Sequence, residues 1–129
     1  MNKHKVLVID DEPDILKLVK ISLEMVEFEV VSALSGEEAL EYLENNMPAL
    51  ILLDVMMPDM DGYQICRHLR RDIKTKNLPI VMLTARGQKG DAEKGFKAGA
   101  SEYVLKPFDP YELGKQIYAI LKKHQKNRA

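Results

Sequence analysis

The sequence predicts an α/β protein built on one open, parallel sheet with helices on both faces. Five short apolar runs alternate along the chain with five longer stretches in which apolar residues recur every three or four positions. Short, continuously apolar runs are typical of strands that are covered on both sides, and the longer stretches are typical of amphipathic helices. Because each run is followed by such a stretch, the chain is predicted to contain five strand–helix units that join parallel strands.

The five expected strands differ in how completely apolar they are. The run at 49–53 is the most apolar of the chain and is expected at the centre of the sheet. The run at 28–31 contains the charged residue Glu29, which suggests a strand at an edge of the sheet. The other three expected strands are residues 6–9, 79–83 and 102–105.

Residues that favour helix starts support the first, second and last helices. Pro13 is favoured in the first turn of a helix, and Ser35 with Glu38 forms a capping box in which each residue can satisfy a backbone N–H of the other. Asp109, followed by Pro110, supplies an N-cap and a proline at the first helical position of the last helix. These three helices are therefore expected to begin at defined residues.

The remaining helices are defined by apolar spacing. The third should begin near Tyr63, whereas residues 86–100 contain four of the seven glycines, so any helix there is intrinsically weak. The side chains expected to face the core are Ile15, Leu16, Leu18, Val19 and Leu23 in the first helix, Ile65, Cys66 and Leu69 in the third, and Leu113, Ile117, Ile120 and Leu121 in the last.

The composition limits the class of protein. A length of 129 residues suits a single domain, with a core of about residues 5–122 and a basic tail at 123–129. The formal net charge of −1 argues against binding nucleic acid through the overall charge of the domain. With one cysteine, Cys66, no intrachain disulfide can form, and no stretch approaches the roughly 20 apolar residues of a membrane span. We therefore expect a cytoplasmic protein without membrane or direct nucleic-acid contacts.

Polar residues stand at the carboxyl ends of four of the five expected strands. They are Asp10 and Asp11, Asp54, Thr84 and Lys106. In a parallel sheet all carboxyl ends lie at the same edge, so these side chains are expected to converge on one pocket. The second strand adds no such residue, as expected at an edge. This suggests the strand order 2-1-3-4-5, with the acids beside the reversal between strands 1 and 3.

These residue types together predict phosphoryl-transfer chemistry. Three carboxylates in one pocket repel one another unless a cation joins them. Mg²⁺ fits an oxygen-only site best, because it keeps several waters and shares its coordination shell with phosphate; Mn²⁺ is the alternative. Lys106 would add a second positive charge and Thr84 a hydroxyl donor, while Asp54 would act as the nucleophile.

Four segments resemble the response regulator receiver family of bacterial two-component systems. They are VIDDEP at 8–13, LDVMMPDMDG at 53–62, LTA at 83–85 and LKPF at 105–108. All four occur in order at the ends of apolar runs, and the resemblance covers about residues 5–122. It implies a flavodoxin-like (βα)5 domain and a signalling phosphoprotein that catalyses only its own phosphoryl transfer and dephosphorylation.

The resemblance implies a role for each acidic residue. Asp54 would accept a phosphoryl group from the phosphohistidine of a sensor histidine kinase or a phosphotransfer protein. Asp11 would bind Mg²⁺ directly, and Asp10 would assist partly through water. The backbone carbonyl of Met56 would complete the protein ligands, together with Asp54.

The resemblance also assigns residues to the response. Thr84 and Lys106 would hold phosphoryl oxygens, and Tyr103 would be the switch aromatic that turns inward as Thr84 moves toward the phosphate. The fourth helix, fifth strand and fifth helix would then offer an altered surface to a partner, to an output domain or to a second copy in a phosphorylation-dependent homodimer. In the family the Lys106–Pro107 peptide bond is usually cis, which aims the lysine into the pocket.

Alternative interpretations depend on particular positions. A phosphatase of the haloacid dehalogenase type would carry an acid two residues after its nucleophile, where this chain has Met56. A flavin or nucleotide module would need a glycine- or hydroxyl-rich loop after the first strand, where residues 10–12 are acidic. A degenerate receiver that serves as a docking scaffold remains the alternative function, although the complete acidic site argues against it. Tyr103 could also be an ordinary core aromatic.

The basic residues at 122–128 are interpreted first as the solvated end of the last helix and second as a linker to an output domain.

Met56 and Arg86 stand two residues beyond Asp54 and Thr84, and neither can orient a hydrolytic water as a base would. This predicts a phosphoaspartate of moderate to long lifetime.

Overall fold

A computed structural model describes residues 4–55, 57, 61–85 and 91–128. Within these ranges five strands alternate with five helices, as the apolar runs predicted. In chain order the elements are β1 (Lys5–Ile9), α1 (Pro13–Glu24), β2 (Glu29–Ala33), α2 (Gly36–Leu43), β3 (Leu50–Asp54), α3 (Gly62–Arg71), β4 (Ile80–Ala85), α4 (Asp91–Ala98), β5 (Glu102–Lys106) and α5 (Pro110–Arg128). None of these helices combines the length and the apolar character that crossing a membrane requires.

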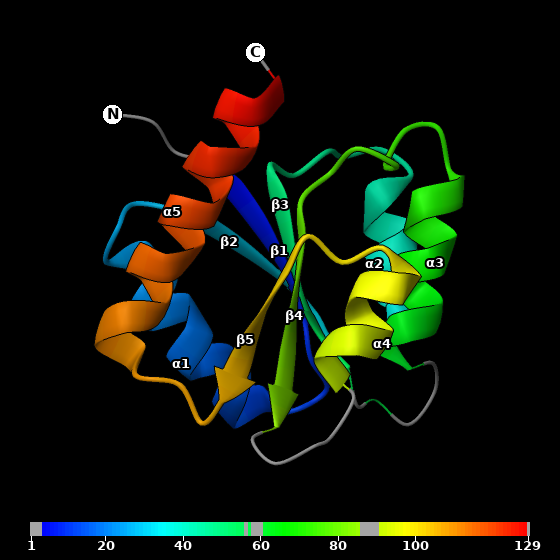
Figure 1. Cartoon of the computed structure of the whole chain (residues 1–129). Helices are drawn as coiled ribbons and strands as arrows, with labels where there is room; N and C mark the ends of the chain where they lie inside the picture. The colour runs from blue at the N-terminus through cyan, green and yellow to red at the C-terminus, as the bar shows by residue number, and fades with distance from the viewer. Residues whose placement is uncertain (1–3, 56, 58–60, 86–90, 129) are drawn as a thin grey trace.

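The strands form one parallel sheet in the order β2-β1-β3-β4-β5 (Figure 1). This is the predicted order, with β2 at an edge. Ile9 of β1 pairs with Leu53 of β3, so Asp10 and Asp54 reach the carboxyl edge at the same level on neighbouring strands. Lys106, the last residue of β5, pairs with the last residue of β4 at that edge. The strand reversal therefore lies beside the acids.

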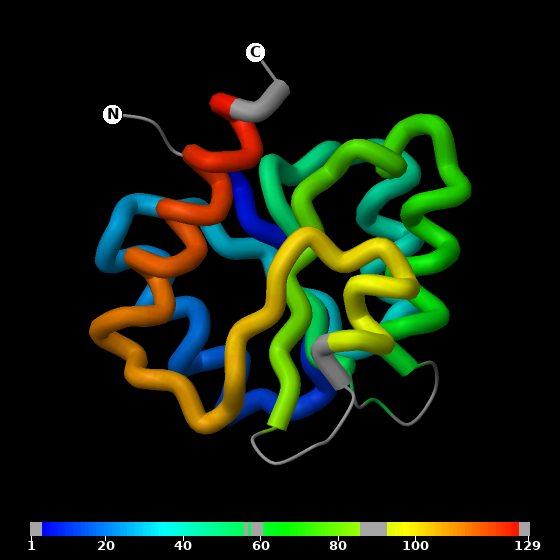
Figure 2. Tube along the Cα trace, in the orientation of Figure 1, coloured from blue at the N-terminus to red at the C-terminus, as the bar shows by residue number. Residues whose placement is uncertain are grey.

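Helices cover both faces of the sheet, and successive strand residues point to opposite faces. Leu7 packs in a core cluster with residues of α2 and α3, whereas Val6 and Val8 pack in a second cluster with residues of α1 and α5. Figures 1 and 2 show the corresponding layers, with α1 and α5 on one side of the sheet and α2, α3 and α4 on the other. Burial on both faces explains why the inner strands are apolar at nearly every position.

Three helices begin at side chains that accept a hydrogen bond from the first helical turn. Ser35 Oγ accepts the backbone N–H of Glu38 at 3.1 Å, as the capping box predicted. Asp109 Oδ1 accepts the backbone N–H of Tyr111 at 2.9 Å. Asp61, which was not predicted as a cap, accepts the N–H three residues later at 2.9 Å. Each cap satisfies a donor that the helix itself leaves unpaired.

The prediction that Leu18 faces the core is wrong. Leu18 is 43 % exposed, and the fully buried residues of α1 are Val19, Ser22 and Leu23. The close packing of α5 against α1 is centred on Ser22 and does not extend to Leu18. The Gly114 N–H donates to Ser22 Oγ at 2.9 Å, and a Cβ at Gly114 would overlap the Ser22 carbonyl oxygen. Leu18 lies one turn before Ser22 on the same side of α1, and beyond this contact it lines an apolar groove and stays partly in solvent.

Smaller differences concern the ends of elements. β2 extends to Ala33, and Phe28, predicted as its first residue, is buried just before it. In the described part of the glycine-rich segment, residues 91–98 form the eight-residue helix α4. Ile120, predicted to face the core, is partly buried, unlike the fully buried Ile117. None of these differences changes the topology.

Gly114→Ala is expected to lower the free energy of unfolding by about 1–3 kcal/mol, because the new methyl group overlaps the Ser22 carbonyl oxygen at a contact between two packed helices. Urea unfolding followed by circular dichroism measures this change. Lys115→Ala, at the exposed neighbouring position, is the control and should leave the midpoint almost unchanged. Coincident unfolding curves for Gly114→Ala and the unchanged protein would contradict the proposed packing.

Candidate functional site

Three charged side chains meet at the carboxyl edge of the sheet. Asp10 follows β1, Asp54 ends β3 and Lys106 ends β5. The Lys106 Nζ lies 3.2 Å from Asp54 Oδ1 and 3.4 Å from Asp10 Oδ2. Asp10 is 0 % exposed and Asp54 is 3 % exposed, so both carboxylates are withdrawn from water. The structure thus brings together three side chains from three different strands.

Four acidic residues surround this point. Asp10, Asp11, Glu12 and Asp54 each contribute one carboxylate oxygen, and these oxygens all lie within 4.8 Å of one another. Asp11 is partly buried and Glu12 is exposed, so the cluster opens to solvent on one side. Glu12 was not predicted as a ligand; its signal in the sequence is its place directly after two acids at a strand end. Met56, whose backbone carbonyl was predicted as a further ligand, lies outside the described residues.

Lys106 carries the positive charge of the site. Burial lowers the pKa of its ammonium, but the attraction of Asp54 and Asp10 outweighs burial and raises that pKa above its ordinary value of 10.5. The ammonium is therefore charged at neutral pH. Because the pKa is raised on folding, the stability that this interaction contributes is present at neutral pH and is lost only as the pH rises above about 10.5.

The positive charge of Lys106 does not balance the acids. Among the described residues of the site, one ammonium faces four carboxylates, since Lys106 also lies 3.9 Å from Glu12 Oε1. Asp10 Oδ1 additionally accepts the backbone N–H of Glu12 at 3.0 Å, which orients the carboxylate. An excess of closely spaced, negatively charged oxygens favours a hard divalent cation such as Mg²⁺.

The backbone around Asp54 is held by close contacts. Asp54 pairs with Leu83, so Thr84, which is buried, stands one residue further along the neighbouring strand at the same edge. A Cβ at Gly62 would lie 2.6 Å from the Asp54 carbonyl oxygen, and the Gly62 N–H donates to the Val55 carbonyl at 3.0 Å. The start of α3 therefore lies directly against the backbone of Asp54. This requirement for glycine was not predicted.

Tyr103 lies on β5, on the side of the sheet that faces α4. It is 38 % exposed, and its ring meets the Phe96 ring of α4 edge to face, with 5.7 Å between the ring centroids. Leu105, two residues further along β5, is also exposed. Tyr103 is thus not a buried core aromatic but a partly exposed residue of a surface formed by α4 and β5.

An apolar groove of about 470 Å³ opens beside the acids. Its lining consists of Glu12, Ile15, Leu18, Ala85, Lys106, Pro107 and Phe108. The Lys106–Pro107 peptide bond is cis, as the resemblance implied. Arg86, which follows the groove residue Ala85 in the chain, lies outside the described residues. The exposed Leu18 therefore lines a groove next to the charged site.

Comparisons with known proteins agree with these observations. A family model described as the response regulator receiver domain matches residues 6–118. A probable transcriptional regulator, ycf27, from Guillardia theta is 44 % identical over 124 residues, which are 96 % of this chain and 48 % of the relative. The alkaline phosphatase synthesis transcriptional regulatory protein PhoP of Bacillus subtilis is 42 % identical over 97 % of this chain and 51 % of its own length. The chain thus spans about half the length of the curated relatives it matches.

Two solved structures of receiver size match this chain over nearly their whole length. A putative response regulator from Chloroflexus aurantiacus is 40 % identical, with a TM-score of 0.89 over 94 % of this chain and 99 % of that one. The BeF3-activated DrrB receiver domain is 34 % identical, with a TM-score of 0.82 and the same coverage of both chains. These likenesses extend to the arrangement of all five strand–helix units.

Asp54→Asn is expected to raise the free energy of unfolding by about 1 kcal/mol at neutral pH in buffer with a chelator, because relief of repulsion among four carboxylates and of the burial of one of them outweighs the lost attraction to Lys106, which keeps Asp10 as a partner. Urea unfolding measures this change. Glu41→Gln, at an exposed position of α2, is the matched control for the loss of one negative charge and should have almost no effect. If Asp54→Asn destabilises the protein instead, the attraction between Asp54 and Lys106 outweighs the repulsion among the acids, which would contradict an excess of negative charge at the site.

Proposed function

Because the chain belongs to the response regulator receiver domain family, we propose that it carries a signal as a phosphoryl group on Asp54. One observation supports the choice of this residue most directly. Its buried carboxylate lies 3.2 Å from the Lys106 ammonium and within the same cluster as Asp10 and Asp11. No observation favours the alternative of a degenerate receiver that serves only as a docking scaffold.

The phosphoryl donor in this proposal is a phosphohistidine of a sensor histidine kinase or a phosphotransfer protein. A carboxylate oxygen of Asp54 attacks the phosphorus in line, the phosphorus–nitrogen bond breaks, and the leaving imidazole takes up a proton. Lys106 neutralises charge on one phosphoryl oxygen, and the Thr84 hydroxyl donates to another. Attack of water on the acyl phosphate later releases inorganic phosphate and restores the carboxylate.

The acids are proposed to hold a divalent cation during this reaction. Asp10, Asp11 and Asp54, with the backbone carbonyl of Met56, would bind Mg²⁺, and Mn²⁺ could replace it. The described donors fit such an ion, because they are all oxygens, lie close together and open to water on one side. When bound, the ion supplies the positive charge that allows an anionic carboxylate to approach an anionic phosphoryl group.

The apolar groove beside the site is proposed as the surface that the donor protein covers. Leu18 and Phe108 line it together with Lys106, whose Nζ is 3.2 Å from Asp54 Oδ1, so a partner that buries the groove can place its phosphohistidine near Asp54. An exposed apolar surface beside a charged site is typical of a protein interaction site. The exposed Leu18 adds little to the buried core, and in this proposal it contacts the donor protein instead.

The response is proposed to pass through Thr84 and Tyr103. Movement of Thr84 toward the phosphoryl group would leave space that the Tyr103 ring can occupy, which would separate it from Phe96. The surface of α4, β5 and α5 would then change for an output domain, a downstream partner or a second copy of the chain. The partly exposed position of Tyr103 fits the outward state of such a switch.

The output is proposed from the relatives. They are named as transcriptional regulators, and this chain matches about half of each. A relative from Synechocystis is named a DNA-binding regulator. In a protein of that kind we propose that contact with DNA belongs to the other half. The receiver itself would regulate through its protein surface, because its net charge of −1 does not favour a polyanion.

Acetyl phosphate with Mg²⁺ is expected to add about 80 Da to the protein, because a phosphoryl group replaces a hydrogen on a carboxylate. Intact-mass spectrometry at neutral pH detects the adduct. Asp54→Asn should abolish it while circular dichroism shows an intact fold. Asp14→Asn, at an exposed position outside the cluster, is the control and should label like the unchanged protein. Equal labelling of Asp54→Asn would exclude Asp54 as the main acceptor.

Leu18→Glu is expected to slow phosphoryl transfer from a phosphohistidine protein at least about tenfold, because it places a charge in the groove that the donor must cover. Labelling by acetyl phosphate, which needs no protein surface, should stay unchanged. Ile21→Glu is the matched control, since Ile21 is an exposed apolar residue of the same helix outside the groove. Equal loss with both donors would place the defect in the site instead of in the docking surface.

A further inference from the structure

Arg70, near the end of α3, connects three parts of the chain that are distant in sequence. Its Nε donates to the Gly99 carbonyl at 2.7 Å, and its Nη1 donates to the carbonyls of Leu78 at 2.6 Å and Lys76 at 3.0 Å. Its Nη2 donates to Ser101 Oγ at 3.2 Å. One guanidinium therefore joins α3 to the segment before β4 and to the segment between α4 and β5.

The partners of Arg70 are all neutral. Three are backbone carbonyls and one is a hydroxyl, and none of the salt bridges among the described residues includes this guanidinium. Hydrogen bonds from a charged donor are strong and directional. The position of the partly buried Arg70 guanidinium is therefore determined by these neutral oxygens and not by a carboxylate.

Gly99 makes the contact with Arg70 possible. Its φ of +112° is in the left-handed region, and a Cβ there would lie 2.6 Å from Arg70 Cγ. The Gly99 N–H donates to the Phe96 carbonyl at 3.0 Å and the Ala100 N–H to the Gly95 carbonyl at 2.8 Å, which is the Schellman arrangement at a helix end. The Arg70 charge thus lies at the carbonyl end of α4, where a cation is favourable.

Ser101 extends this attachment to the sheet. Its Oγ, which accepts from Arg70, also accepts the Ile80 N–H at 3.2 Å, and the Ser101 N–H donates to the Ile80 carbonyl at 2.8 Å. Ile80 is the first residue of β4. The C-terminal end of α4 is therefore fixed to α3 and to the start of β4 by the same group of residues.

The two ends of α4 lie toward opposite edges of the sheet. β4 ends at the carboxyl edge beside Thr84, and β5 begins at the amino edge, so α4 runs back from one edge toward the other (Figure 2). The hydrogen bonds of Arg70 hold the end that is farther from Asp54. Phe96 of α4, which contacts Tyr103, lies two residues before the C-terminal end of the helix, close to the end that is held.

We propose that Arg70 is a positioning residue that holds the C-terminal end of α4 in place, so that α4 rotates about this end when Asp54 is phosphorylated. This inference rests on the proposed function. A helix fixed at its far end converts a displacement at its near end into a rotation, which moves Phe96 relative to Tyr103 in a defined direction. Without the fixed end, the helix shifts as a whole, and the change at its surface is less closely coupled to the phosphoryl group.

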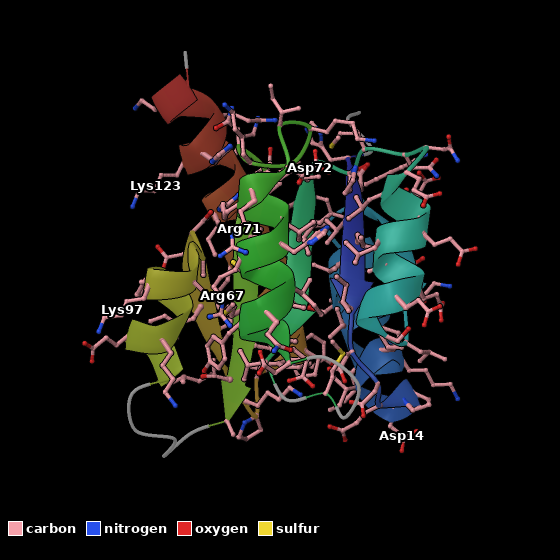
Figure 3. The ribbon with its side chains drawn as sticks, turned by 90° about the vertical axis from the view of Figure 1, so that its right-hand side faces the viewer. Asp14, Arg67, Arg71, Asp72, Lys97 and Lys123 are labelled. Carbon is pink, nitrogen blue, oxygen red and sulfur yellow. The ribbon has the colours of Figure 1, made fainter. Side chains whose placement is uncertain are left out.

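The attachment itself is tested without phosphorylation. In Arg70→Met, amide hydrogen exchange at Gly99 and Ala100 should speed up about tenfold or more, because their helix end loses the charged donor that holds it. Arg71→Met is the matched control, since Arg71 is the neighbouring residue of α3 and is exposed (Figure 3). Unchanged exchange in Arg70→Met would overturn the proposal.

The rotation is tested with beryllofluoride and Mg²⁺ as a phosphoryl mimic, by NMR of backbone amides. In the unchanged protein, the chemical shift changes should be large at 93–98 and should diminish toward 99–101. In Arg70→Met, the changes at 99–101 should become as large as those at 93–98, with labelling of Asp54 by acetyl phosphate retained. Large changes at 99–101 in the unchanged protein, or the same pattern in both proteins, would overturn the proposal.

If Arg70→Met does not fold, two milder variants test the role of Arg70. Ser101→Ala removes one acceptor of Arg70 and should give a smaller effect in the same direction. Arg70→Lys keeps the charge but loses the planar set of donors, so its amide exchange at Gly99 and Ala100 should lie between that of the unchanged protein and that of Arg70→Met. Failure of the unchanged protein to respond to beryllofluoride would contradict the proposed function, whereas unaltered amide exchange in Ser101→Ala and Arg70→Lys would contradict the role of Arg70.

Discussion

The contact of the Lys106 ammonium with the buried carboxylates of Asp54 and Asp10 is the constraint on which the site depends. A carboxylate withdrawn from water is costly unless a cation lies close to it, and here one lysine serves two acids at 3.2 and 3.4 Å. The three residues stand at the ends of three strands, and they meet here because those strands are parallel and end at the same edge. The topology of the sheet is therefore a precondition of the chemistry, and the unbalanced negative charge that remains is what makes the site suited to a divalent cation.

Much of this arrangement could be predicted from the sequence, because it depends on patterns that are local. Apolar runs identify strands covered on both faces, and the polar residue that ends each run lies at the carboxyl edge in any parallel sheet. This is why Asp10, Asp54, Thr84 and Lys106 could be placed together, and why β2, with its charged residue, could be placed at an edge.

The features that could not be predicted depend on pairs of residues far apart in the chain. The Gly114 N–H meets Ser22 Oγ across 92 positions, and this contact buries Ser22 between α1 and α5, whereas Leu18, one turn earlier on the same side of α1, is left exposed. Arg70 meets Gly99 across 29 positions, and in the sequence it is one arginine among several on a basic helix. Gly62 is needed because α3 starts against the backbone of Asp54. Helical spacing and residue type contain no information about such contacts.

The structure also separates the surfaces that the proposed function requires. The groove at Leu18 and Phe108 lies on the side of α1, next to the acids, whereas Phe96 and Tyr103 lie on the side of α4. In the proposed function, the donor protein and the downstream partner would therefore use different surfaces of the domain.

The most direct test of the central claim is to locate the phosphoryl group chemically. Borohydride reduction of the phosphorylated protein converts a phosphoaspartate to homoserine, and tandem mass spectrometry of its peptides then shows the position. We predict homoserine at position 54 alone, formed only when Mg²⁺ is present during phosphorylation; homoserine at position 10 or 11, or formation that does not depend on Mg²⁺, would contradict the account.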